Sequence, residues 1–117
     1  MTGSIEQQIQ EVEVNIEAAR SIIAKGDAID RLYQNKDFQE IIIQGYLKDE
    51  AHRLALLSGV PHLDPLKGAN ILRDIQAIGT FYAFLDTTLK RADQMREDVG
   101  RDLATLDELR AHEGQED

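Results

Sequence analysis

The sequence predicts an all-α protein, and three observations lead to this prediction. Apolar residues recur at steps of three and four along most of the chain, which is the spacing of one face of a helix. Apolar and polar residues never alternate over a stretch long enough for a sheet. The two prolines, Pro61 and Pro65, stand close together and predict a loop between helices. We expect one helical domain over residues 1–117, an antiparallel helical hairpin or three-helix bundle with a long coiled-coil-like C-terminal helix.

The first helix is expected over about residues 4–34. Ser4 and Gln7 form a capping-box pattern, in which a hydroxyl and an amide satisfy backbone N–H groups of the first turn. Gly26 interrupts the helix and predicts a weak point or kink, because glycine costs roughly 1 kcal/mol relative to alanine inside a helix. Before it runs an apolar seam with heptad spacing: Ile5, Ile9, Val12, Ile16, Ala19 and Ile23.

The second helix is expected over about residues 37–58. Asp37 with Glu40 is a second capping pattern at its start. Gly59 after Ser58 predicts a left-handed C-terminal stop. The helix carries an apolar face wide enough to contact two neighbours: Phe38, Ile41, Ile42, Ile43, Tyr46, Leu47, Leu54, Leu56 and Leu57.

The third helix is expected over about residues 65–111, followed by an acidic tail at 112–117. Asp64 is a capping residue and Pro65 suits the first helical position, although a break at Gly68 would move the start to Asn70. Two glycines, Gly45 in the second helix and Gly79 in the third, are candidates for close helix contacts. The heptad seam of the third helix covers five repeats: Ile71, Ile75, Ile78, Tyr82, Leu85, Leu89, Ala92, Arg96, Val99, Leu103 and Leu106.

The lengths of the helices predict that the third one overhangs the second. Its seam spans roughly 54 Å, whereas the second helix spans roughly 33 Å. Either the first helix runs through Gly26 and covers the remainder, or another chain does. Beyond Met95 the apolar stripe narrows and gains Arg96, a polar residue of the kind that sets register or oligomeric state in coiled coils. We expect an intermolecular seam in this part, formed by Arg96, Val99, Leu103, Leu106 and Leu109.

The charge balance narrows the class of partner. The chain has 13 Lys and Arg against 22 Asp and Glu, a formal charge of −9, which argues against nucleic acid and anionic membranes as partners. Counted by halves the acidity is even: 10 acidic and 6 basic residues up to Ser58, then 12 and 7. The N-terminal stretch also lacks the pattern of a signal peptide, and we expect no membrane-spanning segment.

No residue pattern in the chain points to catalysis, a cofactor or a metal. Cysteine is absent, which excludes disulfides, thiolate metal sites and a cysteine nucleophile. The three histidines, His52, His62 and His112, are not paired at a spacing that puts two ligands on one helical face. There is no nucleophile elbow and no phosphate-binding glycine loop. We expect no enzyme, and a helical-bundle enzyme is kept only as a third hypothesis.

Two segments resemble a family of small helical proteins encoded by tailed bacteriophages. They are residues 32–57, LYQNKDFQEIIIQGYLKDEAHRLALL, and residues 74–81, DIQAIGTF. The resemblance implies a virion structural or assembly component with no enzymatic role.

We therefore expect a non-enzymatic structural or assembly protein of a tailed bacteriophage, located in the virion or the host cytoplasm. It would act through helix–helix contacts with itself or with other virion proteins, and a homo-oligomer is expected. The alternative is a small acidic phage-encoded inhibitor that binds a basic surface of a host or defence protein.

Overall fold

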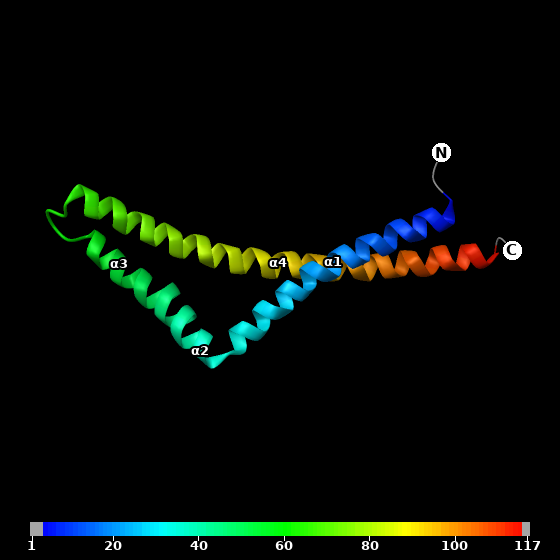
Figure 1. Cartoon of the computed structure of the whole chain (residues 1–117), viewed down its shortest axis with the longest axis horizontal. Helices are drawn as coiled ribbons and strands as arrows, with labels where there is room; N and C mark the ends of the chain where they lie inside the picture. The colour runs from blue at the N-terminus through cyan, green and yellow to red at the C-terminus, as the bar shows by residue number, and fades with distance from the viewer. Residues whose placement is uncertain (1–3, 116–117) are drawn as a thin grey trace. The chain divides into compact units, whose positions relative to one another are not determined.

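The computed structural model describes residues 4–115, and this part of the chain is all-α with no strand (Figure 1). The fold class predicted from the sequence is therefore confirmed, including the long C-terminal helix. In chain order the elements are α1 (Ile5–Gln34), α2 (Lys36–Phe38), the π-helical segment η1 (Gln39–Glu50), α3 (Ala51–Ser58) and α4 (Pro65–Gln115).

Helix α1 begins with the predicted capping box. The Gln7 N–H donates to the Ser4 hydroxyl, and the Ser4 N–H donates to the Gln7 side-chain oxygen, both at 3.2 Å. The helix then runs unbroken through Gly26 to Gln34. The expected weak point at Gly26 is thus not a break in the helix, because this glycine packs against another helix, as described below.

A single residue, Asn35, joins α1 to the next helical stretch. Its N–H donates to the Leu32 carbonyl at 3.0 Å, and its side-chain oxygen accepts from the Phe38 N–H at 2.9 Å. The capping residue is therefore Asn35, and the prediction of Asp37 is wrong by two positions. An asparagine immediately after a helix serves both ends at once, since it terminates one helix and caps the next.

Residues 36–58 form one helical stretch whose middle part, η1, is π-helical over 12 residues. A π-helix has i→i+5 hydrogen bonds and therefore wider turns than an α-helix. A Cβ added at Gly45 would lie 3.1 Å from the carbonyl oxygen of Glu40, five residues earlier. Gly45 therefore meets its own segment, and its predicted role in a close contact between helices is wrong.

The loop after α3 leads into α4 as the Asp64 and Pro65 pattern predicts. The Asp64 side chain accepts from the Lys67 N–H at 3.2 Å and its carbonyl accepts from the Gly68 N–H at 2.9 Å, so α4 begins at Pro65. The predicted left-handed stop at Gly59 is wrong, because Gly59 has φ −93°. His62 takes the left-handed conformation in this loop, with φ 58°.

Helix α4 continues to Gln115, past the predicted end at residue 111. The first four residues of the expected acidic tail, 112–115, are therefore helical. The last two, 116–117, lie outside the described residues.

The chain divides into two compact units that share the long helices. Unit 1 comprises residues 1–28 and 88–117, and unit 2 comprises residues 29–87. That the two units fold together as a single domain stays a prediction. The division matters for function because each unit has its own surface chemistry.

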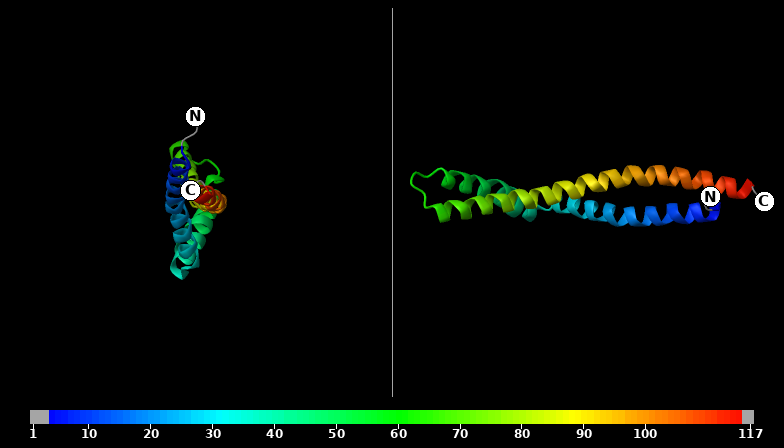
Figure 2. Two further views of the ribbon diagram at one scale, coloured as in Figure 1. Left: turned by 90° about the vertical axis from the view of Figure 1, so that its right-hand side faces the viewer. Right: turned by 90° about the horizontal axis from the view of Figure 1, so that it is seen from above.

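Unit 1 is an antiparallel pair of helices, with α1 and the second half of α4 side by side (Figure 2). Two ion pairs between the helices set their register, Arg96 with Asp27 and Arg110 with Glu13. The buried apolar side chains on the two facing sides are Ile16, Ala19, Ala92 and Leu106. The heptad seams of both helices therefore meet each other within one chain.

Unit 2 is built by the end of α1, the stretch from α2 to α3, and the first half of α4. All three tyrosines and all three phenylalanines of the chain lie in it. Tyr46 and Phe81 pack edge to face with their ring centres 6.0 Å apart, and Tyr33 packs on Phe38 in the same way at 5.8 Å. The buried apolar residues are few: Ile29, Leu54, Ile78 and Leu85.

Candidate protein-interaction surface

The seam predicted to meet another chain is covered mainly by α1 of the same chain. Leu106 is only 5% exposed and is a core residue of unit 1, so its assignment to an intermolecular seam is corrected. Val99 and Leu109 are half-buried, whereas Leu103 remains 43% exposed. The physical reason is that α1 continues through Gly26 and lies along the second half of α4. Of the two alternatives that the helix lengths allow, cover by the first helix or by another chain, the first therefore applies to this part of α4.

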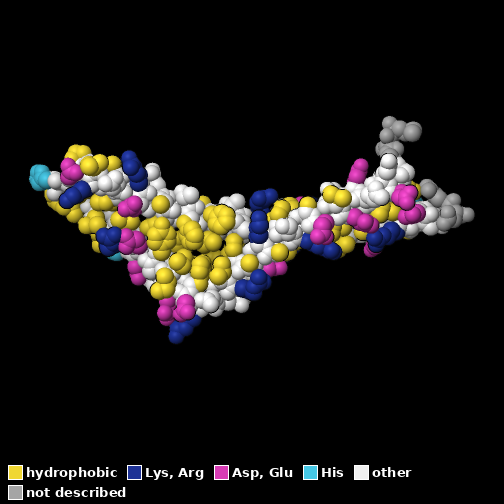
Figure 3. All heavy atoms as spheres, viewed as in Figure 1, with side chains coloured by type: hydrophobic (Ala, Val, Ile, Leu, Met, Phe, Trp, Pro, Cys, Tyr) yellow, Lys and Arg dark blue, Asp and Glu magenta, His cyan; other side chains and the backbone are white. Residues whose placement is uncertain are grey.

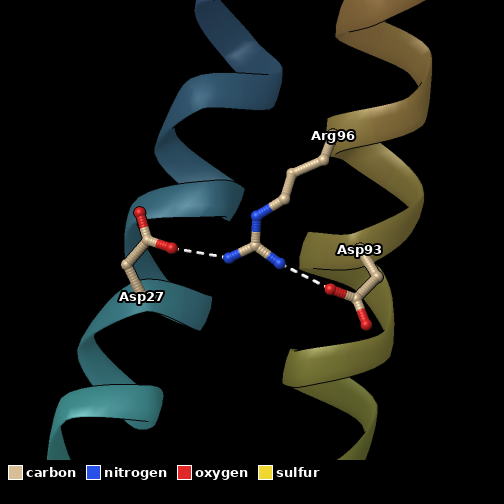
Figure 4. Close-up of polar contacts among 3 residues, drawn as sticks. All are labelled: Asp27, Asp93 and Arg96. Carbon is tan, nitrogen blue, oxygen red and sulfur yellow. Dashed lines mark hydrogen bonds and ion pairs between the residues drawn. The ribbon is translucent and has the colours of Figure 1, made fainter.

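Arg96 is likewise used within the chain (Figure 4). Its guanidinium contacts Asp27 of α1 and Asp93 of α4, each at 2.5 Å. The hydrogen bond with Asp27 raises the pKa of the Arg96 side chain, and attraction to the charges of Asp27 and Asp93 adds to this shift. A polar residue in a coiled-coil seam sets the register of the paired helices. Arg96 has this role between two helices of one chain, so it needs no second chain.

A close contact between the two helices of unit 1 lies beside this ion pair, at Gly26. A Cβ built on Gly26 would stand 2.2 Å from the Cβ of Ala92, which is fully buried. No larger residue fits at position 26 unless the helices move apart. Glycine thus permits the close approach at this point, and its position on the heptad seam was the signal for this in the sequence.

Unit 2 contains the feature that the sequence reasoning missed, an apolar hollow of about 420 Å³. Ile43 and Leu47 of η1 form one wall, and Ile75 and Gly79 of α4 form the other. The remaining lining residues are Tyr33, Lys48, Ala51, Ile78 and Tyr82. The sequence predicts a wide apolar face on the second helix and a close helix contact at Gly79, but a Cβ at Gly79 meets no atom of the chain within 4 Å, so this contact is absent and the space is open.

The two tyrosines at the hollow differ in exposure and environment. Tyr33 is half-buried, and burial raises the pKa of its phenol, with smaller contributions from Tyr82 and from the charge of Asp86. Tyr82 is 53% exposed. The Gln39 side chain donates to the Tyr33 carbonyl at 2.6 Å and holds the end of α1 against the start of η1. The hollow is therefore lined by two tyrosines, one half-buried and one exposed.

Hydrophobic side chains gather on one face of unit 2, over the stretch from η1 to α3 and the first half of α4 (Figure 3). Leu72 is 55% exposed, and it precedes Gly79 by seven residues on α4, so both lie on one face of the helix together with Ile75 and Tyr82. Scattered apolar side chains on a surface need no explanation, but a contiguous patch beside a hollow marks an interaction site. The geometry is suited to contact with apolar side chains of another molecule.

The charge of the chain is divided unevenly between the units. Residues 29–87 carry eight acidic and six basic side chains, a formal charge of −2, whereas residues 1–28 and 88–117 carry fourteen and seven, a charge of −7. The count by halves of the sequence concealed this, because each half contributes to both units. Unit 2 is therefore nearly neutral and apolar, and unit 1 is acidic.

The described part of the chain offers no arrangement that would hold a metal ion, since no three His, Asp or Glu side chains come together in it. None of its helices is long and apolar enough to cross a membrane. Comparisons with models of protein families, with curated proteins and with solved structures find no match for this chain.

Proposed function

We propose that the chain is a non-enzymatic structural or assembly protein of a tailed bacteriophage, which acts through helix–helix contacts with protein partners. The observation that carries this proposal is the apolar hollow of unit 2 with its exposed rim. Covering such a surface with protein releases water from apolar groups and is favourable in proportion to the area covered. A hollow lined by aliphatic and aromatic residues gives a partner helix both an anchor point and a surface to follow.

The position of the family resemblance supports the same proposal. Residues 32–57 and 74–81, which resemble small helical phage proteins, both fall within unit 2, and they include Ile43, Leu47, Ile75 and Gly79 of the hollow. A small docking module is useful on a ring or shell of repeated subunits, since symmetry repeats one weak contact many times. The virion or the host cytoplasm is the proposed location.

The alternative function is that of an acidic inhibitor, and the charge of unit 1 favours it. A formal charge of −7 on a narrow helix pair would steer the chain to a basic surface on a host or defence protein. This binding would weaken steeply as the salt concentration rises, because the contacts are electrostatic. It would use unit 1, whereas the structural role uses unit 2.

Mass spectrometry of purified phage particles tests the proposal. A structural component is expected in the particles in a fixed ratio to a ring or shell protein, and removal of its gene is expected to leave incomplete particles. An assembly factor is expected in particle precursors instead. Absence from both, together with salt-sensitive capture of a basic host protein, would reject the structural role in favour of the inhibitor.

A further inference from the structure

We propose that the hollow of unit 2 is covered by a second copy of this chain. The α4 helices of the two copies would cross near Gly79, and Tyr82 of each copy would enter the hollow of the other. This inference deepens the proposed function, and it rests on that function in one respect only, namely that the chain acts through helix–helix contacts.

Gly79 is the first support, because nothing within its own chain requires a glycine there. A Cβ built on Gly79 would meet no atom within 4 Å, and glycine is among the poorest helix formers. Gly79 lies on the wall of the hollow, where the missing side chain allows another helix to approach closely. Gly26 already permits such an approach to Ala92 inside the chain.

A glycine with open space around it does not by itself indicate a contact between chains, as Gly100 shows. Gly100 also has nothing within 4 Å of an added Cβ, but its neighbours in sequence include Asp98, Arg101 and Asp102, and it is not among the residues that line the hollow of unit 2. Gly79 differs in that it combines the open space with apolar walls.

The second support is that one face carries both a hole and a knob. In a two-fold dimer the same patch of each copy meets itself, so it must present a recess and a projection that fit each other. Here Gly79 and Tyr82 both line the recess, and Tyr82, three residues further on α4, keeps 53% of its surface exposed and so available to a second copy. Leu72, two turns before Gly79, is a second exposed apolar side chain on this face. A partner of unrelated shape would need only the recess.

The third support is the amount of surface that one chain leaves exposed. The chain exposes 8623 Å², whereas a compact folded protein of 13.2 kDa exposes about 6400 Å². The difference is larger than the roughly 800 Å² that each partner contributes to a standard specific interface. The chain as a whole therefore leaves more surface exposed than one side of a standard interface requires.

The fourth support is electrostatic. Two copies can bring unit 2 together because its formal charge is only −2, whereas two unit 1 surfaces at −7 would repel each other. Lys48 is the only charged side chain among the residues that line the hollow.

Light scattering on the purified chain and two leucine variants tests the inference. Wild type is expected to have twice the chain mass of 13.2 kDa at about 100 µM. A Cβ at position 79 meets no atom of its own chain within 4 Å, so Gly79→Leu is expected to fill the recess and to raise the dimer dissociation constant at least about 100-fold, with helicity unchanged by circular dichroism. Gly100→Leu is the matched control on the same helix and is expected to remain a dimer.

A second measurement uses the absence of cysteine from the chain. Residues near a two-fold axis contact their own copies, so Gly79→Cys is expected to form a disulfide-linked dimer under mild oxidation, because disulfides require Cα atoms within about 7 Å. Gly100→Cys is expected to remain largely unlinked.

Two results would overturn the inference. One is a wild-type chain that stays monomeric up to about 500 µM, a concentration at which even weak specific dimers form. The other is a folded Gly79→Leu variant that keeps the wild-type mass, with no linkage in Gly79→Cys. Neither result touches the structural role, because particle content is measured separately, and a chain found in particles but monomeric in solution would keep that role with a different partner.

Discussion

The two units of this molecule solve the same packing problem in opposite ways. In unit 1 two helices approach closely through small residues, Gly26 and Ala92, and pair their charges across the contact. In unit 2 an aromatic pair, Tyr46 with Phe81, and the π-helical segment η1 occur together with a hollow that remains between η1 and α4. Unit 1 thus covers much of its apolar seam with its own helices, whereas unit 2 leaves an apolar hollow open for a partner.

The substitution Gly26→Leu should break the close approach in unit 1 and give the largest effect. A side chain at this position would collide with Ala92, so the free energy of unfolding is expected to fall by about 3 kcal/mol, the upper end of the usual cost of overpacking. Urea unfolding followed by circular dichroism measures this. Gly100→Leu is the control, with no clash and an expected gain of about 0.5 kcal/mol from helix propensity. A gain in stability for both variants would show that the close contact with Ala92 does not exist.

The pair Leu106→Ala and Leu103→Ala separates the core of unit 1 from its surface. Leu106 is 5% exposed and Leu103 is 43% exposed on the same helix. Truncation of Leu106 is expected to cost about 2 to 3 kcal/mol in unfolding free energy, and truncation of Leu103 about 1 kcal/mol or less. If Leu103→Asp instead changed the solution mass while Gly79→Leu did not, the intermolecular contact would lie in unit 1, as the sequence predicted.

The substitution Asn35→Ala should affect the start of unit 2. Loss of the hydrogen bond to the Phe38 N–H is expected to lower the unfolding free energy by about 1 kcal/mol. The comparison is Ser4→Ala at the start of unit 1, where a frayed helix end should cost about half as much or less. Equal costs would mean that the junction at Asn35 is no more important than a free helix end.

The smallest effect expected is a pH dependence from Tyr33. Because burial raises the pKa of this phenol, its contribution to stability is complete below the ordinary tyrosine pKa of about 10 and is lost as the pH rises through the raised value. Wild type is expected to lose slightly more stability than Tyr33→Phe between about pH 9 and about pH 11. Parallel losses in both proteins would place Tyr33 outside the apolar environment of the hollow.

The sequence predicted those features that depend on local patterns. Periodicity gave the three helical stretches, and residues whose side chains act on their own turn, such as Ser4 with Gln7 and Asp64 before Pro65, marked two helix starts correctly. Asn35 was missed because Asp37 offers the same chemistry two positions later. The π-helical form of η1 left no pattern in the apolar spacing, since that stretch is apolar on several sides.

The candidate surface was harder to predict because it depends on which helix pairs with which. A heptad seam indicates that a helix packs against a partner, but it does not indicate which one. The sequence therefore predicts contacts of Leu106 and Arg96 with another chain, whereas α1 of the same chain supplies them. The uneven charge was hidden for the same reason, since each unit combines segments from distant parts of the sequence. The hollow follows from the separation of helices, which no spacing of residues encodes.

The placement of every tyrosine and phenylalanine in unit 2 has a spectroscopic consequence. With no tryptophan in the chain, tyrosine fluorescence and near-ultraviolet circular dichroism come from unit 2 alone, whereas the amide signal comes from both units. Without any added label, the aromatic signal therefore follows unit 2 and the amide signal follows the whole chain. Coincident thermal transitions in the two channels would identify one cooperative folding unit, and separate transitions would identify two.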